Sequence, residues 1–248
     1  MSNHYHIFPL GDAAATFDLG NTISEDLNDK VIAMQHWMLA NSFTGQKDII
    51  IAYSSLTIIY DPVLIKQNFH PVTTVFEWVK NKLQAAFEQS AVQPRTNASP
   101  GRPVNPSAII RIPVCYDAAF GMDLHPMVAE KQMTTAAIIE LHTARTYRVY
   151  TIGFLPGFSY MAEVDEKLIT PRKPSPVPVA AGSVGIAGSQ TGIYPVNSPG
   201  GWHIIGRTPV KQFDASTKEL VKLRVGDRVQ FYAISKEEYE ANVANVKM

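Results

Sequence analysis

"GSQTGIYPVNSPGGWHIIGRTP" (residues 188–209) places five glycines and three prolines around one tryptophan and one histidine. Turn residues at this density separate apolar runs that are too short for helices, which favours short β-strands joined by tight turns. Similar runs occur on both sides, and they predict strands at 146–152, 183–186, 202–205, 220–225 and 228–234. The last two are joined across Gly226-Asp227. Short strands with frequent turns are typical of a barrel or sandwich, so we expect a mostly-β second half.

The N-terminal part of the chain alternates between strand and helix patterns. A strand pattern at 4–17 is broken at Gly11-Asp12, and a helix capped by Ser24 follows it. Residues 49–60 predict two short strands or a bent hairpin, and Thr74-x-x-Glu77 is a capping box that begins a second helix. With a closing strand at 108–114, this order predicts a ferredoxin-like α+β unit.

The chain therefore divides into two predicted domains and a linker. Residues 1–88 form the α+β domain, and residues 89–106 form a proline-rich linker. Residues 107–248 form the mostly-β barrel domain, which begins with two short helices at 123–131 and 134–142. It ends in a charged helix that Ser235-x-x-Glu238 caps.

The overall composition argues against several classes of protein. The 248 residues include 22 basic and 22 acidic side chains, so the formal net charge is zero and no electrostatic footprint for nucleic acid or a membrane is expected. The N-terminus lacks a signal-peptide pattern, and no apolar run is long enough to span a bilayer. Cys115 is the only cysteine, which excludes an internal disulfide. We expect a cytoplasmic protein.

Standard motifs for nucleotide, metal and hydrolase sites are missing. The chain has no G-x-x-x-x-G-K-[ST] loop, no H-E-x-x-H pair and no G-x-S-x-G elbow. The glycine run at 182–188 has the wrong spacing for a dinucleotide fingerprint. Cys115 ends an apolar strand, which favours a packed thiol over a nucleophile. We therefore expect no metal site in this chain.

Glycine is concentrated in one part of the predicted barrel. Seven of the fifteen glycines lie between residues 182 and 206. Barrel corners alone would account for some of them, because a tight bend needs glycine. Glycine also lets a ligand approach the main chain closely. Irregular loops on a rigid barrel are a common place for binding groups, so we favour a binding site in this segment.

Three longer segments resemble a known family. These segments are IPVCYDAAFGMDL (112–124), ELHTARTYRVYTIGFLPGFSYM (140–161) and AAGSVGIAGSQTGIYPVNSPGGWHIIGRTPVKQFD (180–214). They are similar to the B-type subunit of bacterial 5-oxoprolinase, a family also described as allophanate hydrolase subunit 1, as sporulation kinase inhibitor, and as carboxyltransferase subdomain C and D. The resemblance covers about residues 107–234. It implies a small α+β N-terminal domain followed by a cyclophilin-like β-barrel.

The resemblance also implies a shared enzyme. In that family, the B-type subunit and a C-type carboxyltransferase half form a composite site. Together with an A-type subunit, they couple ATP hydrolysis to the opening of 5-oxoproline to glutamate. ATP with Mg²⁺ is then expected at a site shared with a partner subunit. The alternative implied by the family is a non-catalytic inhibitor of a sensor histidine kinase. A stand-alone carboxyltransferase is less favoured, because the chain has no biotin-carrier lysine motif.

This chain departs from the family pattern at one place that affects the expected site. The family usually has a second proline-arginine pair, followed by V-P-A-G-S-V, whereas here Val177 follows Pro176 and Ala180 stands in place of the proline. One basic side chain expected near the site is therefore missing. Substrate or activity differs from the family if that arginine holds an anionic group.

Roles for the matched residues follow from their chemistry. We assign His142 as a general acid or base, because its unperturbed pKa lies near 6.5; the alternative is a histidine that caps a helix C-terminus. Arg172 is the candidate cation for a carboxylate or phosphate, and the alternative is a surface salt bridge. We expect neutral hydrogen bonds to a cyclic amide from Ser183, Gln190 and Tyr194.

The remaining predicted contacts are apolar or backbone. Phe158 and Tyr160 are expected to form a wall, and Gly200 and Gly201 leave room for the ligand. Trp202 is expected to act as a packing anchor that holds the glycines in place, rather than as a platform for the ligand. His203 is the weakest candidate of the set.

Overall fold

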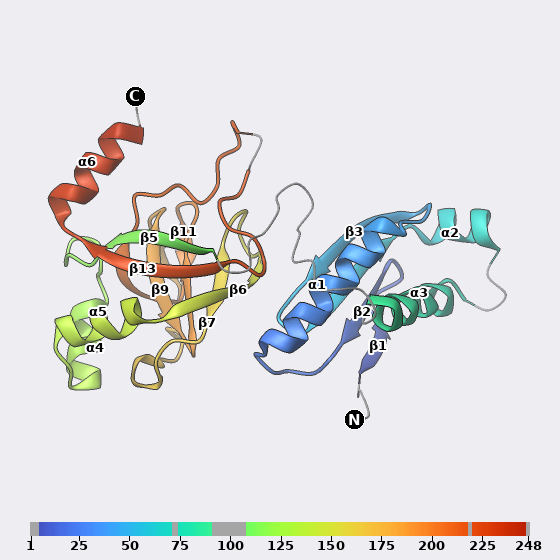
Figure 1. Cartoon of the computed structure of the whole chain (residues 1–248), viewed down its shortest axis with the longest axis horizontal. Coiled ribbons are helices and arrows are strands. Elements are labelled where there is room, and N and C mark those ends of the chain that lie inside the picture. Colours follow the sequence, from blue (N-terminus) through green and yellow to red (C-terminus); the bar gives the residue numbers. More distant parts are fainter. Residues whose placement is uncertain (1–4, 71–73, 91–107, 218–219, 247–248) are drawn as a thin grey trace. The chain divides into compact units, whose positions relative to one another are not determined.

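The computed structural model describes residues 5–70, 74–90, 108–217 and 220–246 of the chain. The chain separates into two compact units, Met1–Asn105 and Pro106–Met248 (Figure 1). Of the predicted linker at 89–106, the first two residues end a helix, and the rest lie outside the described residues.

The first unit is a four-stranded antiparallel sheet with helices (Figure 1). Its strands run in the spatial order β1-β2-β4-β3. In chain order the elements are β1 (His6–Pro9), β2 (Ala14–Asp18), α1 (Glu25–Ala40), β3 (Gln46–Ile51), β4 (Ser55–Tyr60), α2 (Pro62–Phe69) and α3 (Val75–Ser90).

The helix starts follow the capping residues seen in the sequence. Leu27 donates its backbone N–H to the Ser24 hydroxyl at the start of α1, over 3.4 Å. Glu77 donates its N–H to the Thr74 hydroxyl at the start of α3, over 3.1 Å. These side chains satisfy backbone donors that have no partner inside the helix. The predicted starts of both helices are therefore confirmed.

The ferredoxin-like topology is not confirmed. The predicted closing strand at 108–114 lies in the second unit as β5 (Ile109–Cys115), where it pairs with other strands. The fourth strand of the first sheet comes instead from the N-terminal hairpin, because Gly11 turns the chain with a φ of 65°. The coarser prediction of an α+β unit with two strands at 49–60 agrees with the structure.

The second unit is built around a closed barrel, as predicted. The barrel order is β10-β7-β6-β13-β5-β12-β9, and only the β13–β5 pair is parallel. The strands of this unit are β5, β6 (Thr146–Ile152), β7 (Ser159–Ala162), β8 (Val177–Val179), β9 (Ser183–Ala187), β10 (Gln190–Ile193), β11 (Ser198–Gly200), β12 (His203–Arg207) and β13 (Arg228–Ile234). Its helices are α4 (Leu124–Lys131), α5 (Thr135–Ala144) and α6 (Lys236–Val246), with a 3₁₀ turn at Glu166–Leu168.

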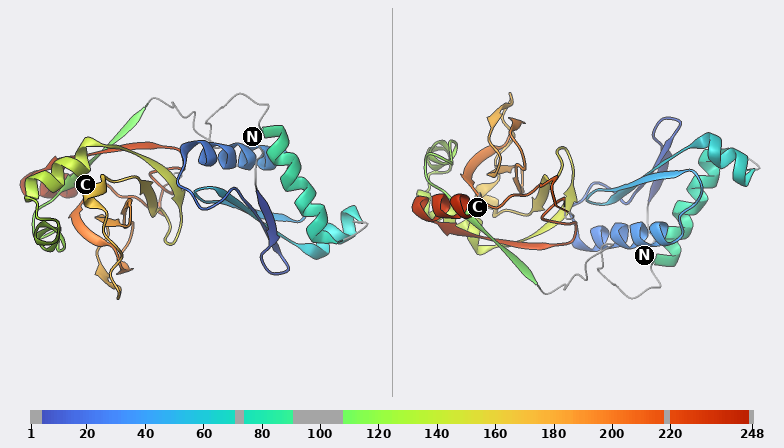
Figure 2. Two further views of the ribbon diagram at one scale, coloured as in Figure 1. Left: turned by 90° about the horizontal axis from the view of Figure 1, so that it is seen from below. Right: turned by 90° about the horizontal axis from the view of Figure 1, so that it is seen from above.

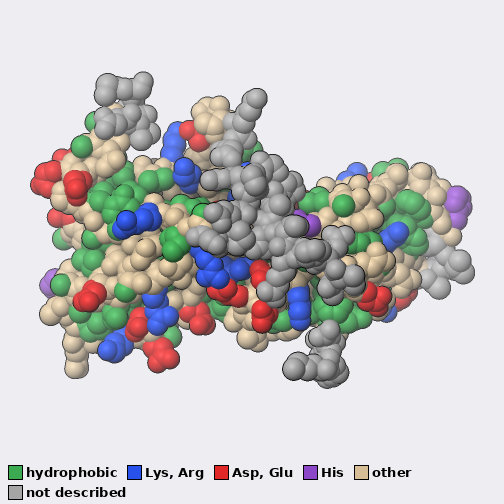
Figure 3. All heavy atoms as spheres, in the orientation of Figure 1, with side chains coloured by type: hydrophobic (Ala, Val, Ile, Leu, Met, Phe, Trp, Pro, Cys, Tyr) green, Lys and Arg blue, Asp and Glu red, His purple; other side chains and the backbone are tan. Residues whose placement is uncertain are grey.

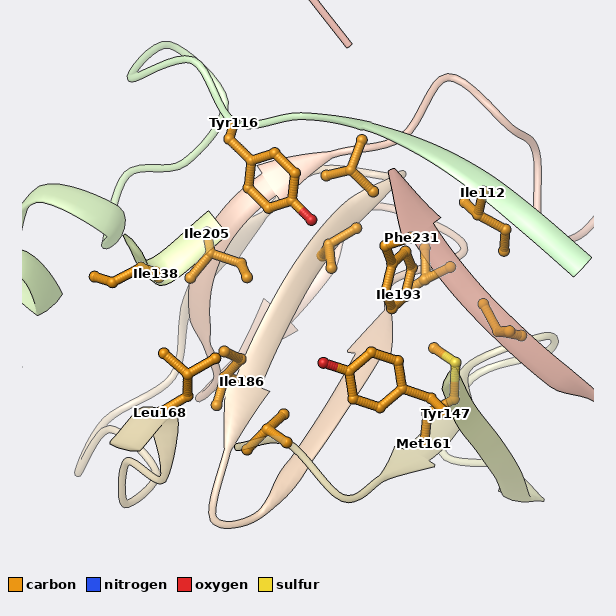
Figure 4. Close-up of a cluster of buried hydrophobic side chains, with 14 of the residues drawn as sticks. Ile112, Tyr116, Ile138, Tyr147, Met161, Leu168, Ile186, Ile193, Ile205 and Phe231 are labelled. Carbon is orange, nitrogen blue, oxygen red and sulfur yellow. The ribbon is translucent and has the colours of Figure 1, made fainter. Parts of the chain in front are cut away.

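The barrel interior is a packed core rather than a pore. Side chains from every wall converge on it, among them Ile112, Tyr147, Ile186, Ile193 and Phe231 (Figure 4). Each of these is at most 1% exposed. Alternation along a strand sends every second side chain inward, which is why short strands suffice to fill the centre.

One predicted strand is wrong. Within residues 220–225 only an isolated bridge between Phe213 and Val221 forms, so no hairpin joins this segment to β13. The turn bonds instead to β6, because Gly226 donates its N–H to Val149 over 2.8 Å and Val149 donates to Asp227 over 2.9 Å. The turn at Gly226-Asp227 therefore pairs with β6, which is distant in sequence, instead of joining a hairpin between neighbouring segments.

A separate ribbon extends from one side of the barrel (Figure 2). It consists of β8 and β11, which pair antiparallel with Ser198 opposite Val179 and Gly200 opposite Val177. Prolines face each other in the middle of this pair, at positions 178 and 199. Because proline cannot donate a backbone hydrogen bond, a strand of this kind stays short and peripheral.

The surface carries charges of both signs (Figure 3). Acidic side chains gather over α6, whose first turn holds Glu237 and Glu238. The reciprocal bonds between Ser235 and Glu238, of 2.7 and 3.1 Å, confirm the predicted cap of this helix. Among the described helices, none combines the length and the apolar character needed to cross a bilayer.

Candidate functional site

A cavity of about 770 Å³ lies beside the barrel, between the projecting ribbon and the loops around it. Its wall is aromatic. Phe158 lies in edge contact with Tyr194 at 5.0 Å and with Trp202 at 5.3 Å, and Tyr160 packs against Phe158 at 4.7 Å between ring centroids. Edge-to-face pairs of this kind are favourable beyond their buried area. The predicted wall of Phe158 and Tyr160 is therefore part of a larger rigid aromatic cluster.

The glycines of the opening stretch make room for these rings. A Cβ at Gly192 would lie 2.8 Å from the Ser159 carbonyl oxygen and 3.1 Å from atoms of Phe158 and Trp202. A Cβ at Gly200 would lie 2.6 Å from the Cζ of Tyr194. Neither distance is compatible with a side chain, so large rings pack directly against bare backbone. Aromatic packing around the cavity therefore explains the glycines at positions 192 and 200.

Several polar side chains line the cavity without a hydrogen-bond partner among the described residues, and the buried Ser198 hydroxyl is one of them. Arg172, Gln190 and Tyr160 line it, and their side chains make no hydrogen bond or ion pair with any other described residue. A mostly apolar pocket with a few polar groups is typical of a small-molecule site. The guanidinium of Arg172 can grip two oxygens, and the Gln190 amide can both donate and accept.

Both tyrosines of the cavity are neutral hydrogen-bond donors at neutral pH. Burial raises the pKa of the Tyr160 and Tyr194 hydroxyls, and the nearby Arg172 cation opposes this rise. Desolvation outweighs the attraction because the phenolate would lose most of its hydration. Among the described residues that line the cavity, Arg172 therefore supplies the one charge, and the other groups are neutral.

Phe154 is a cavity residue that the sequence reasoning missed. It is 66% exposed, lies in edge contact with Phe158 at 5.9 Å and lines the cavity. Its φ is 67°, a left-handed conformation that is unusual for a bulky residue. The signal was present in the flanking Gly153 and Gly157, which mark an irregular turn between β6 and β7.

His142 does not lie at the cavity, and this corrects its predicted role. It is fully buried at the C-terminal end of α5, and its ring stacks on Phe231 at 4.7 Å. Its Nδ1 lies 2.7 Å from the Tyr116 hydroxyl, and its Nε2 lies 2.9 Å from Oγ1 of Thr191. Burial lowers the pKa of His142 to about 3. A buried neutral ring with both nitrogens bonded does not serve as a general acid or base for a ligand in the cavity, nor does it cap the helix.

The tautomer of His142 follows from its partners. Thr191 donates its hydroxyl proton to the Gly185 carbonyl over 3.1 Å, so it accepts from Nε2–H of the ring. Nδ1 is then unprotonated and accepts from the Tyr116 hydroxyl, whose pKa burial raises well above its usual value. The four groups form one directed chain behind β9 and β10. Every buried polar atom in it is satisfied, as a stable interior requires.

Ser183 is the second predicted site residue that the structure places elsewhere. It is 1% exposed in β9, where its carbonyl accepts from the Tyr194 N–H over 2.9 Å, and it does not line the cavity. Its contribution to the site is to hold the backbone of Tyr194. The sequence does not show which way Ser183 faces, because strand pairing fixes the direction of each side chain and depends on distant residues.

The other predicted residues do line the cavity. Besides the residues already described, these are Gly200 and Gly201. Trp202 is 5% exposed, as expected for a packing anchor, and it also forms part of the cavity wall. His203 donates from Nε2 to the Pro171 carbonyl over 2.9 Å, so it holds a loop. Cys115 is a buried thiol whose pKa burial raises, which agrees with packing.

Two neighbouring glycines provide a matched pair of substitutions. Gly200→Ala is expected to lower the free energy of unfolding by about 1–3 kcal/mol, because its Cβ overlaps the buried Tyr194 ring. Gly201→Ala is expected to change it by less than about 0.5 kcal/mol, because the atoms nearest to its Cβ lie 3.5 Å away. Urea unfolding of both variants measures the difference. Equal effects would contradict the packing explanation.

No carboxylate lines the cavity, and no group of three or more His, Cys, Asp or Glu able to hold a metal ion occurs in the part of the chain that the structure describes. Mg²⁺ prefers oxygen ligands that include carboxylates, so the lining residues do not fit a Mg²⁺–nucleotide complex. The cavity fits a small organic molecule that carries an anionic group.

Comparisons with known proteins agree with this architecture. Residues 5–223 match the model of the carboxyltransferase domain, subdomain C and D. The chain is 36% identical over 243 residues to the B-type 5-oxoprolinase subunit of Bacillus subtilis (strain 168), a match that covers 97% of this chain and 98% of that protein.

Solved structures extend the comparison to the fold. The crystal structure of TTHA0988 superposes with a TM-score of 0.73 and 32% identity, over 90% of this chain and 40% of the other. The urea amidolyase of Kluyveromyces lactis superposes with a TM-score of 0.74 at 16% identity, over 97% of this chain and 15% of that one. This chain spans less than half of either solved chain. The second likeness shows the fold alone.

Proposed function

This chain belongs to the family of the carboxyltransferase domain, subdomain C and D, and from that premise we propose that it is the B-type subunit of an ATP-dependent 5-oxoprolinase complex. Its task is to bind the cyclic amide that the complex opens, 5-oxoproline, which yields glutamate. The family match and the 36% identity to the Bacillus subtilis 5-oxoprolinase subunit over nearly the whole chain support this assignment.

The observation that carries the proposal is a cation that has no ion-pair partner in the described part of the chain and lies beside an aromatic wall. 5-Oxoproline is a flat five-membered lactam with one carboxylate. Arg172 offers a charge-assisted grip for the carboxylate, and Gln190 offers a donor and an acceptor to the lactam amide. The rings of Phe158, Tyr160 and Trp202 enclose the apolar ring carbons.

The chain's own residues bind and orient the lactam, and they do not supply the reacting groups. Ring opening needs an activating group and a proton carrier at the amide. Within the described residues, the cavity lining contains no carboxylate, histidine or cysteine for this purpose. We therefore assign ATP, Mg²⁺ and the acid–base groups to the companion subunits, a C-type carboxyltransferase half and an A-type subunit. At about 770 Å³ the cavity exceeds the size of one lactam, which leaves room for a partner's residues.

The proposal is tested by reconstitution. The chain is expressed together with A-type and C-type 5-oxoprolinase subunits, and ATP hydrolysis is measured with and without 5-oxoproline. We expect 5-oxoproline-dependent hydrolysis only when all subunits are present, with glutamate as the product. Equal hydrolysis in the absence of this chain would contradict the proposal.

Inhibition of a sensor histidine kinase is the alternative function. It needs no chemistry in the cavity and acts through the barrel surface. A gene neighbourhood without the companion subunits favours it, and catalysis by the reconstituted complex counts against it. No feature of the described residues favours it over the enzyme subunit.

A further inference from the structure

The loop that carries Arg172 is held by bonds on both sides of that residue. Pro171 accepts a hydrogen bond from Nε2 of His203 over 2.9 Å. Lys173 donates its backbone N–H to the Gly201 carbonyl over 2.8 Å. The backbone on either side of Arg172 is thus tied to residues 201–203, while the Arg172 side chain has no partner of its own among the described residues.

A third bond comes from a side chain far away in sequence. Asp123 accepts from Nζ of Lys173 over 2.6 Å and from the backbone N–H of Ile204 over 2.7 Å, both through the same carboxylate oxygen. The side chains of Lys173 and Asp123 are only 16% and 14% exposed. A single carboxylate therefore joins the Arg172 loop to the start of β12.

The position of Asp123 makes this use of its carboxylate informative. It is the N-cap residue of α4, yet its side chain makes no capping hydrogen bond. An aspartate at an N-cap normally accepts a hydrogen bond from a backbone N–H in the first turn of its helix and stabilises that end. Here the carboxylate bonds to Lys173 and Ile204 instead. The Asp123 side chain therefore does not cap α4, and it connects this helix start to the loop and strand beside the cavity instead.

We propose that Asp123 and Lys173 form a positioning pair that holds the guanidinium of Arg172 at the edge of Gly201, where it meets an anionic group of the ligand. A Cβ at Gly201 would lie 3.5 Å from one terminal nitrogen of Arg172, which places the guanidinium there. The identity of the ligand rests on the proposed function, whereas the placement of Arg172 does not. Neither Asp123 nor Lys173 lines the cavity, so they act through Arg172.

The reason for such a pair is entropic. An exposed arginine on an irregular loop samples many conformations, and ordering it on binding reduces affinity. Fixing the loop in advance removes part of that cost. An ion pair between largely enclosed side chains holds geometry better than an exposed pair, which contributes little. The Lys211–Asp214 pair, with a 62% exposed lysine, is a contrasting case in the same unit.

The test uses the reconstituted complex and conservative variants. Asp123→Asn keeps an acceptor for the Ile204 N–H but loses the charge, and Lys173→Met keeps the length of the chain. We expect each to raise the KM for 5-oxoproline about tenfold with kcat changed less than about twofold, the pattern of lost binding. Lys173→Arg is expected to restore the KM. Lys211→Met, which breaks the exposed pair, is the control and is expected to leave the KM unchanged.

A double-variant cycle separates positioning from general stability. In an Arg172→Gln background, Asp123→Asn is expected to have no further effect on KM, because the residue it positions is absent. If Asp123→Asn raises the KM by the same factor in the native protein and in Arg172→Gln, the proposal is overturned. An unchanged KM in the single variants would also overturn it.

A second measurement does not depend on the enzyme. In the ¹⁵N-labelled full chain, the Nε–Hε signal of Arg172, identified by its loss in Arg172→Lys, is expected to be dispersed. In Asp123→Asn we expect the chemical shift of this signal to move toward the value typical of mobile arginine side chains, while the backbone amide signals stay in place. A signal unchanged by Asp123→Asn would overturn the positioning pair. If the complex shows no 5-oxoproline-dependent hydrolysis while the signal behaves as expected, the proposed function fails and the positioning pair stands.

Discussion

Replacing Arg172 by glutamine is expected to weaken the binding of 5-oxoproline by about 10- to 100-fold, the range expected for a lost hydrogen bond to a charged group. The physical reason is that Arg172 is the one cation among the cavity-lining residues and has no competing carboxylate within the described chain. Isothermal titration of the assembled complex with 5-oxoproline measures the change. The affinity of Arg172→Lys for 5-oxoproline is expected to lie between those of the native protein and Arg172→Gln. An ammonium keeps the positive charge but cannot bind both carboxylate oxygens as a guanidinium does.

The ligand itself provides the sharpest control. 2-Pyrrolidinone has the same lactam ring without the carboxylate, so its affinity is expected to be equal in the native protein and in Arg172→Gln. Arg145→Gln is the matched control on the protein, since Arg145 binds Asp165 over 3.1 Å and does not line the cavity. Equal losses for both ligands in Arg172→Gln would show that the arginine does not hold the carboxylate.

Replacing His142 by alanine is expected to lower the free energy of unfolding by about 3 kcal/mol or more. The loss comes from packing, from the Tyr116 hydroxyl that is left without its acceptor, and from the bond that Thr191 accepts from the ring. Urea unfolding at pH 7 measures it. Because His142 does not line the cavity, the variant that remains folded is expected to bind 5-oxoproline as the native protein does. A variant as stable as the native chain, with reduced turnover, would restore the catalytic assignment.

The same residue makes stability depend on pH in a defined window. The folded-state pKa of His142, lowered by burial to about 3, lies below the unfolded value of 6.5. Between these values the unfolded chain binds a proton that the folded chain excludes, so stability is lost as the pH falls from 6.5 toward 3. Above pH 6.5 the ring is neutral in both states and the effect vanishes.

The measurement compares urea unfolding at pH 7 and pH 5. In His142→Gln we expect a smaller loss of stability between these two values than in the native chain, because the titrating group is gone. His125→Gln, at an exposed position of α4, is the control and is expected to keep the native pH dependence. An unchanged slope in His142→Gln would contradict the buried neutral ring.

Much of the cavity was accessible to sequence reasoning. The motif segments contain four predicted site residues that all line one cavity: Phe158, Tyr160, Gln190 and Tyr194. These residues lie on or beside the short strands that the turn residues delimit, so the local pattern already places them near one another. His142 and Ser183 belong to the same segments but point away from the cavity, a distinction that the pattern does not contain.

Two further elements, α2 and β5, show which features a local sequence pattern contains and which it does not. The helix α2 begins at Pro62 with Asp61 as its cap, a recognisable signal of a helix start that the strand pattern before it obscured. The partner of β5 was not recognisable. Its apolar residues suit any sheet, and its pairing with β13, parallel from Ile109 opposite Arg228 onward, and with β12 places it in the barrel.

The sequence by itself determined where helices start, where the chain turns and which residue types surround the cavity, because capping and turn formation depend on groups within a few residues of one another. The tertiary structure alone decided that His142 is buried inside the barrel and that Asp123 reaches Lys173. It also decided that Arg172 lies beside bare backbone at Gly201, without a hydrogen-bond or ion-pair partner among the described residues. Burial, strand pairing and ion pairs across fifty residues depend on how distant segments pack, and no local pattern encodes that outcome.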